Sequence, residues 1–188
     1  GFEADGPALV VAADAPRGEH GSRVDHAAGA GAAALLLSPD GSATLAEAAT
    51  HTAEYPGTRF RRRGAETVDR YDATAYERRA FTEPVAAAVR KLDDPAETVA
   101  MTAPDGGMPH RAARRFGFDA SVVEVASRVG DAGAASALLG LVAAWNGGAE
   151  RVTCVGYGDG ATVDALVLDG ALPASFDRET EALDYGGY

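Results

Sequence analysis

A tight turn between an apolar run and an arginine-rich segment is where this sequence could mount catalytic groups. The stretch VAMTAPDGGMPHRAARRFGF, residues 99–118, passes through this turn at residues 104–107. A strand, a turn and a helix in this order project side chains and backbone N–H groups beyond the edge of a sheet. The turn holds neither Lys nor Cys, and His110 follows it. It therefore has the form of a reactive loop without the usual reactive side chains.

The remaining reactive side chains follow no metal-binding or nucleophile pattern. Cys154, the single cysteine, lies in the apolar run VTCV, where a thiol usually packs as a small hydrophobic group. It has no partner for a disulfide within the chain. The histidines lack the spacing of metal ligands, and we interpret all four as surface or packing residues: His20, His26, His51 and His110.

Two polar motifs each allow two interpretations. Residues 61–63 are three consecutive arginines, which could hold an anionic group such as a nucleotide phosphate or could simply be solvated. Asp131 stands in GDAG at the start of a predicted helix, where it can cap free N–H groups or point into a cleft. The glycine clusters at residues 29–34 and 156–161 are weaker signals. The first lacks the third glycine of a dinucleotide fingerprint and the second lies between strands, so neither predicts a phosphate loop.

The elements that would position these groups follow a mixed α/β pattern. We expect strands at residues 8–13, 33–37, 43–54, 98–102, 151–157 and 162–168, and helices at residues 72–92, 109–116 and 132–145. Turn signals at residues 39–42 and 158–160 predict two antiparallel hairpins, which join the strands on either side of each turn. Residues 55–68 are polar and basic, and we interpret them as an irregular loop.

Composition limits the class of partner. The chain has 188 residues, 46% of them hydrophobic, and a net charge of −11, with Lys91 as its single lysine. Such an acidic chain repels nucleic acid and anionic membranes, so neither is expected as a partner. An acidic, lysine-poor composition fits a halophilic protein, although a high-GC genome gives the same bias. The absence of a signal peptide and of a long apolar run favours a cytoplasmic protein.

Four segments in order resemble one family, the archaeal-type hydroxymethylglutaryl-CoA (HMG-CoA) synthases. VVAADAPRGEHGSRVDHAAGAGAAALLLS is similar to their strand, D-(T/S)-x-x-G loop and glycine-alanine run, and TAPDGGMPHRAARRFGF to their H-Q-P-N-G-K-F-P turn and helix. VGDAGAASALLGLVAAWNGG resembles their G-N-T-Y-S-x-S helix start, and VGYGDGATVDALVL their final hairpin. The resemblance implies a thiolase-like α/β fold, with this chain as mostly its C-terminal half: a mixed five-stranded sheet flanked by helices.

The family condenses acetyl-CoA with acetoacetyl-CoA through a Cys nucleophile, a Glu acid/base and a His that polarises a thioester. The Cys and Glu belong to the N-terminal half, and the His position here is Thr102. The family's helix-start Asn becomes Asp131, the turn's Asn becomes Asp105, and the turn's Lys becomes Gly107. These changes remove donors and positive charge from one cleft, and losing a single such donor typically costs about 10²–10³ in rate.

The resemblance also suggests where a substrate would bind and which ligand would occupy the site. The substrate-binding positions it implies are Asp105, Gly106, Gly158 and Gly160. The implied ligand is acetyl-CoA or another acyl-CoA, with no further cofactor and no metal.

Three functions follow as hypotheses. The first is a catalytically degenerate domain, a pseudoenzyme that serves as a structural or acyl-CoA-binding partner. The second is an active acyl-CoA-condensing acyltransferase that uses Cys and Glu from the other half. The third is a ligand-binding domain unconnected with acyl-CoA.

Domain organisation and partners follow from the same resemblance. We expect residues 1–170 to form the thiolase-like half and residues 171–188 to be a linker or tail, which in relatives leads to a zinc-ribbon and OB-fold module. The chain begins with Gly and not Met, so we expect a piece of a longer protein. The family implies a homodimer, or a heterodimer with another thiolase-fold protein. An isolated half should expose an apolar face and aggregate.

Overall fold

A five-stranded mixed sheet forms the centre of the computed structural model, which describes residues 6–55, 57, 59–70, 77–101, 103, 106–175, 182 and 184. Its strands, in spatial order, are β3 (Thr44–Thr52), β9 (Thr162–Asp169), β8 (Arg151–Gly158), β6 (Thr98–Met101) and β7 (Ser121–Val123). Strand β6 runs parallel to both β7 and β8, whereas β9 is antiparallel to β8 and to β3. The mixed sheet and the β8–β9 hairpin predicted from the sequence are confirmed.

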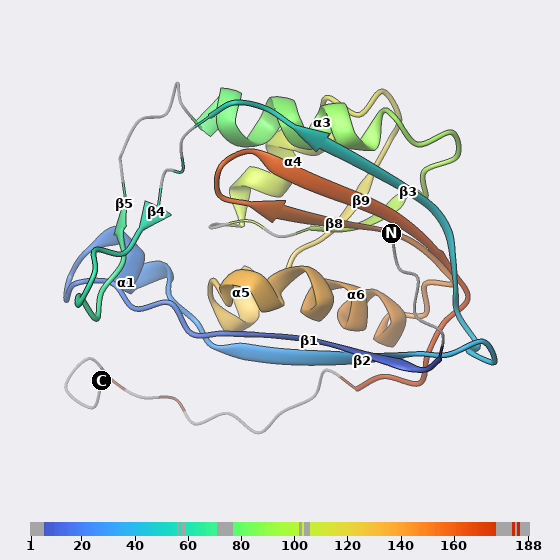
Figure 1. Ribbon diagram of the computed structural model, residues 1–188, viewed down its shortest axis with the longest axis horizontal. Coiled ribbons are helices and arrows are strands. Elements are labelled where there is room, and N and C mark those ends of the chain that lie inside the picture. Colours follow the sequence, from blue (N-terminus) through green and yellow to red (C-terminus); the bar gives the residue numbers. More distant parts are fainter. Residues whose placement is uncertain are drawn as a thin grey trace.

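Helices cover both faces of this sheet (Figure 1). One face carries η1 (Arg78–Thr82), α3 (Glu83–Val89) and α4 (Gly107–Ala113), and the other carries η2 (Gly133–Ala135) and α6 (Ser136–Asn146). Each face has its own core, because alternate residues of β8 point to opposite sides: Val155 joins Phe81 in one cluster, and Cys154 joins Leu141 in the other. Within the described part of the chain, no helix has the length and apolarity needed to cross a bilayer.

Small side chains allow α6 to lie close to the sheet. A Cβ atom on Gly140 would approach the Cβ of Ala100 on β6 to 3.2 Å, closer than side chains normally pack. Gly140 therefore fits where a larger residue would push the helix outward. The alanine- and glycine-rich composition is thus used for tight contact between layers.

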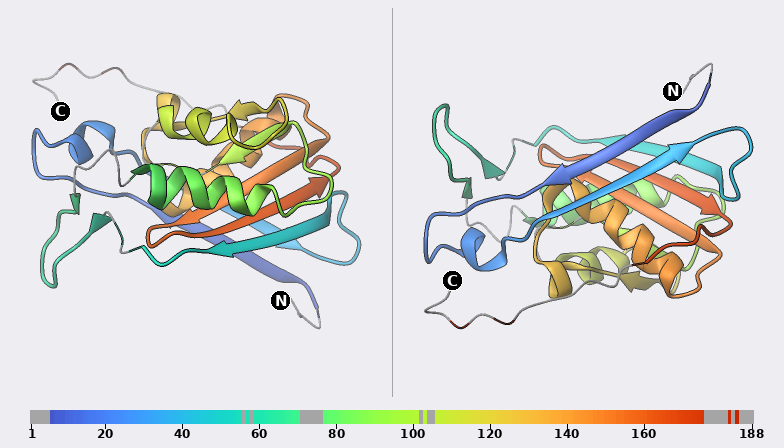
Figure 2. Two further views of the ribbon diagram at one scale, coloured as in Figure 1. Left: turned by 90° about the horizontal axis from the view of Figure 1, so that it is seen from above. Right: turned by 90° about the horizontal axis from the view of Figure 1, so that it is seen from below.

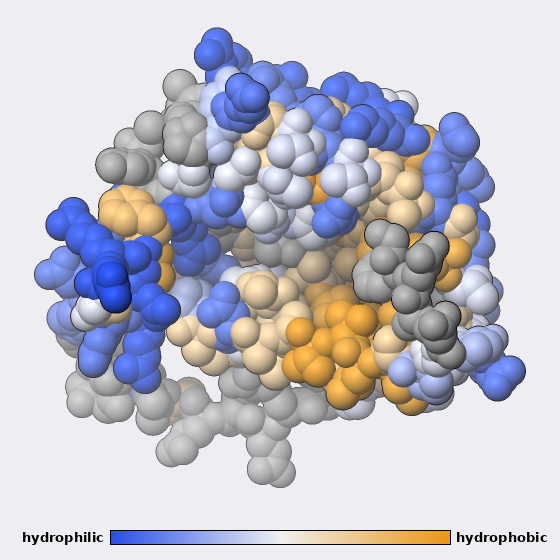
Figure 3. Space-filling model, in the orientation of Figure 1, coloured by the Kyte–Doolittle hydropathy of each residue, from blue (hydrophilic) through white to orange (hydrophobic). Residues whose placement is uncertain are grey.

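A separate two-stranded antiparallel sheet lies on the far side of α6 (Figures 1 and 2). It pairs β1 (Ala8–Asp14) with β2 (Gly31–Leu37), and Leu9 lies directly opposite Leu36. One face packs toward α6 through Leu35. The other face is exposed, with Leu9 at 65% and Leu36 at 68%. Figure 3 shows apolar side chains gathered over β1, β2 and the adjacent part of α6.

The predicted hairpin between residues 33–37 and 43–54 is wrong. Strand β2 pairs with β1, whereas β3 pairs with β9 along the edge of the five-stranded sheet. The turn itself forms, with the Gly41 N–H donating to the Ser38 carbonyl at 3.3 Å. It carries the chain from one layer to the other, because α6 lies between the two sheets and keeps β2 and β3 apart.

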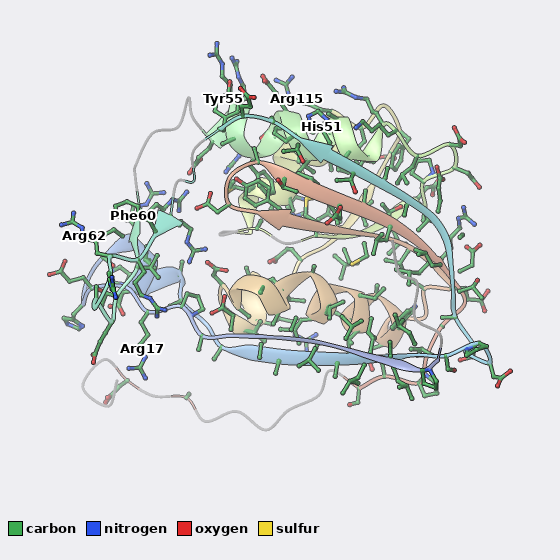
Figure 4. All side chains as sticks on the ribbon, viewed as in Figure 1. Arg17, His51, Tyr55, Phe60, Arg62 and Arg115 are labelled. Atoms are coloured by element: carbon green, nitrogen blue, oxygen red, sulfur yellow. The ribbon has the colours of Figure 1, made fainter. Side chains whose placement is uncertain are left out.

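The segment interpreted as an irregular loop, residues 55–68, contains one strand of a short pair, and the second strand follows it directly. Arg59 of β4 (Arg59–Phe60) pairs with Arg70 of β5 (Asp69–Arg70). This β4–β5 hairpin lies beside α1 (Arg23–Ala27), and Figure 4 shows Phe60, Arg62 and Arg17 together at this end of the molecule. The sequence did not predict the hairpin because each strand has only two paired residues.

Candidate functional site

Asp131 lies buried where three parts of the chain meet. It follows α5 (Ala126–Val129) and Gly130, whose φ of +73° favours glycine. Its backbone N–H donates to the Ala27 carbonyl at 2.7 Å, and its carbonyl accepts from the Gly29 N–H at 3.0 Å. These bonds fix the backbone of Asp131 against the end of α1. The residue is 3% exposed, so its carboxylate needs partners within the protein.

Arg59 supplies the countercharge for this carboxylate. Its Nη1 lies 2.6 Å from Asp131 Oδ2, and the second oxygen, Oδ1, accepts from the Gly133 N–H at 3.0 Å. The Arg59 side chain is only 17% exposed. The backbone N–H of Arg59 donates to the Asp159 carboxylate, which fixes the start of the β4–β5 hairpin to the β8–β9 turn. Both oxygens of Asp131 are therefore satisfied.

A pocket of about 400 Å³ opens beside this ion pair, and we call it the Asp131 pocket. Its lining includes Asp14, Arg59, Phe60, Arg61, Ala103, Asp131, Tyr157, Gly158 and Asp159. The carboxylates are occupied within the protein: Asp14 accepts from the Ala134 N–H at 3.2 Å, and Asp159 accepts from the Arg59 N–H. The described lining offers paired charges and a phenol, but no imidazole, thiol or amine. Such a lining can bind and orient a ligand, but it supplies no group that exchanges a proton readily near neutral pH.

The predicted site residues divide between this pocket and other places. Asp131 and Gly158 line it together. Gly160 lies in the β8–β9 turn with φ of +125°, and Gly106 caps α4 beside Glu124; neither lines the pocket. Thr102 and Asp105 lie outside the described residues. The flanking Ala103 does line the pocket, so the end of β6 reaches it.

The residues beside Asp131 differ from the sequence interpretation in one respect. The sequence suggested a carboxylate in a cleft that had lost positive charge, whereas the structure places the Arg59 guanidinium against it. His26 and His110 are both exposed and neither lines the pocket. Among residues 61–63, Arg61 lines the pocket and Arg62 pairs with Asp69 at 3.3 Å on the surface.

Four pocket residues were not found from the sequence: Asp14, Arg59, Tyr157 and Asp159. Arg59 was visible only as part of a basic stretch, and its partner is 72 positions away. Asp159 was recognised only as a turn residue. The acidic end of β1 and the turn of the β8–β9 hairpin are the signals that could have indicated Asp14 and Asp159, because strand ends commonly carry site residues.

Cys154 is buried away from this pocket, and its chemistry can be predicted. Burial raises the pKa of its thiol to about 12, so the thiol stays protonated at every pH below that value. At pH 8 only about 10⁻⁴ of it is thiolate. We expect native protein to react with iodoacetamide only as fast as it unfolds, and protein in urea to react rapidly. Native labelling that outpaces unfolding would contradict the assignment of Cys154 as a packing residue.

Solved structures give the class of fold. A crystal structure of HMG-CoA synthase complexed with CoA matches with a TM-score of 0.70 and 16% identity, over 88% of this chain and 49% of that one. 3-Oxoacyl-(acyl carrier protein) synthase III from Pseudomonas aeruginosa PAO1 matches with a TM-score of 0.67 and 18% identity, over 89% of this chain and 59% of that one. At these identities the likeness shows the fold alone, and that fold is the thiolase-like fold of condensing enzymes.

Sequence comparison shows which protein of this fold class the chain is similar to. The chain is 28% identical to hydroxymethylglutaryl-CoA synthase from Methanopyrus kandleri over 171 residues, which is 84% of this chain and 48% of that protein. No protein-family model matches the chain. The chain is therefore similar in sequence to HMG-CoA synthase and has a thiolase-like fold, as the resemblance predicted, and it spans about half the length of these relatives.

Proposed function

We propose that this chain is a catalytically degenerate, HMG-CoA-synthase-like domain that binds acyl-CoA and serves a partner protein, without performing the condensation itself. The observation that supports the proposal most strongly is the Arg59–Asp131 ion pair. It places two opposite charges, 2.6 Å apart, where the resemblance implies a neutral Asn. A carboxylate has no proton to donate to a developing oxyanion, and the Arg59 guanidinium is already occupied by it, whereas the donors for that charge must be preorganised and unoccupied.

The proposal of acyl-CoA as ligand rests on the pocket and on the relatives. The Asp131 pocket remains open beside the ion pair, with a volume of about 400 Å³ and the apolar surfaces of Phe60, Ala103 and Tyr157 in its lining. A solved relative is described as complexed with CoA. We infer that the acyl end of an acyl-CoA occupies this pocket. No further cofactor is needed for binding.

The proposed partner is another thiolase-fold protein or a second copy of this chain. The support is the outer face of β1 and β2, where Leu9, Val11 and Leu36 are between 61% and 68% exposed. Large apolar side chains opposite one another on an open sheet face favour burial against another surface. A zinc-ribbon and OB-fold module to which the linker or tail at residues 171–188 leads is part of the same proposal.

Calorimetric titration of the chain with acetyl-CoA tests binding, and release of free CoA from acetyl-CoA plus acetoacetyl-CoA tests chemistry. We expect measurable heat of binding and no release of CoA above the rate without protein. Gly158→Phe should fill the pocket and weaken acetyl-CoA binding by about tenfold, a change of about 1.4 kcal/mol. The matched control is Thr162→Phe at the residue paired with Gly158, because Thr162 is exposed and does not line the pocket.

Each other outcome would decide against the proposal. Release of CoA at a catalysed rate would show the active condensing acyltransferase instead. Absence of binding heat would favour a domain unconnected with acyl-CoA. Equal loss of binding in the Gly158 and Thr162 variants would show that the ligand does not occupy the Asp131 pocket.

A further inference from the structure

A second, larger concavity lies between η1 and α4, on the outer side of the helices that cover the five-stranded sheet. Its volume is about 820 Å³, and we call it the arginine groove because four of its lining residues are arginines: Arg78, Arg111, Arg114 and Arg115. The remaining lining residues are Glu77, Thr82 and Met108. The described linings of this groove and of the Asp131 pocket share no residue, so the two are separate features of the surface.

The positive charge of this groove is only partly balanced by the described residues around it. Among the described lining residues Glu77 is the one acidic side chain, and its carboxylate already binds Arg70 and lies 4.0 Å from Arg111. Arg78 pairs with Glu83 at 3.6 Å. Arg114 and Arg115 are exposed, and neither side chain has an acceptor or ion-pair partner among the described residues. In a chain with a net charge of −11, a concave surface that concentrates four guanidiniums is unexpected.

The helices on the two walls of the groove place these arginines around the same concavity. Arg111, Arg114 and Arg115 are three and four positions apart on and just after α4, so they lie on one side of that helix. Arg78 begins the π-helical turn η1 on the opposite wall. Arg90 extends the basic rim, because its guanidinium donates to the Arg115 carbonyl at 3.2 Å. Figure 4 shows Arg115 on the α3–α4 side of the molecule, away from the β4–β5 hairpin.

The floor of the groove is less polar and more buried than its arginine rim. Thr82 and Met108 line it, and they are only 8% and 4% exposed. A cationic rim around a less polar floor complements a helix that has acidic residues flanking an apolar stripe. A phosphate group would instead require donors that converge on one point, whereas these guanidiniums are distributed along two walls.

We propose that the arginine groove is a docking site for an acidic, amphipathic segment of a partner protein. The charges would steer the encounter and set the orientation of the segment, and the floor would receive its apolar stripe. This proposal does not depend on acyl-CoA binding in the Asp131 pocket.

Fluorescence anisotropy with a labelled helical peptide of glutamate and leucine tests the proposal on the full chain. We expect binding that weakens as salt is raised, and no binding of a control peptide with glutamine in place of glutamate. Arg114→Glu with Arg115→Glu should weaken binding by about tenfold or more, because like charges would then face each other. Arg62→Glu with Arg63→Glu is the matched control, since these exposed arginines lie on the β4–β5 hairpin; its affinity should change by less than about twofold.

Three results would overturn the proposal. The first is an affinity for the acidic peptide no greater than for its glutamine control. The second is equal weakening by the two double variants. The third is displacement of the peptide by inorganic pyrophosphate at low concentration, which would assign the groove to a phosphate ligand. Thermal unfolding of each variant shows whether it is folded, and all four positions are exposed to solvent.

Discussion

Replacing Arg59 by alanine is expected to lower the free energy of unfolding by about 3–5 kcal/mol, the range found when one partner of a buried ion pair is removed. Asp131 is 3% exposed and would keep only the Gly133 N–H as a partner for its carboxylate. The Arg59 side chain is also mostly buried, so solvent screens the pair only weakly. The variant would leave a buried carboxylate without its countercharge.

Urea unfolding of three variants separates this effect from the loss of packing. Arg61→Ala is the matched control, because Arg61 is exposed on the same hairpin and should change stability by about 0.5 kcal/mol or less. The double variant Arg59→Ala with Asp131→Asn should recover much of the loss, since a neutral amide still accepts from Gly133. Equal stabilities of the Arg59 and Arg61 variants would show that the ion pair is not a structural element of the folded chain.

Because of this ion pair, a neutral hydrogen-bond donor at position 131 could be introduced only together with a change at Arg59. Neutralising Asp131 alone would leave the Arg59 guanidinium buried without a counterion, which is unfavourable for the same reason. A return to a neutral donor at position 131 therefore requires a change at Arg59 as well. The two residues form one unit, and this unit joins the β4–β5 hairpin to the loop before α6.

Much of the sheet could be predicted from the sequence because its signals are local. The β8–β9 hairpin follows from two apolar strands around a glycine-rich turn, and α6 from an apolar run that ends at Gly147. The pairing of β2 was not predictable in this way. A turn after residue 37 is visible, but whether the next strand pairs or crosses to another layer depends on α6, which lies about 100 residues later in the chain.

The candidate site shows the same limit. Asp131 was found because GDAG precedes a helix and resembles a family motif, which are both local properties. Its partner Arg59 was not, because a sequence does not state which of several neighbouring arginines turns inward. Only the folded structure distinguishes these arginines: Arg59 is buried beside Asp131, whereas Arg62 remains on the surface with Asp69.

The exposed sheet of β1 and β2 has a consequence for assembly. Leu9 and Leu36 lie opposite each other in the register, so their side chains form one continuous apolar area with Val11. The opposite face of the same sheet packs toward α6 through Leu35. A sheet that is apolar on both faces but covered on one resembles a layer within a larger structure.

Replacing both Leu9 and Leu36 by lysine is therefore expected to abolish self-association, or association with a thiolase-fold partner. Two charges placed opposite each other on the buried face of an interface should weaken it by more than about 100-fold, since each must be desolvated without a partner. Sedimentation velocity over a range of protein concentrations measures the change. Because both side chains are exposed in the chain by itself, the folded chain should tolerate the lysines.

Leu45→Lys provides the matched control for this experiment. Leu45 is 50% exposed and equally apolar, but it lies on β3 at the edge of the five-stranded sheet. A wild-type chain that sediments as a monomer at every concentration and binds no thiolase-fold protein would contradict the prediction. So would a Leu45 variant that dissociates as readily as the Leu9 and Leu36 variant, because the interface would then lie on the other sheet. If only the Leu9 and Leu36 variant dissociates, the outer face of β1 and β2 is the surface that the partner covers.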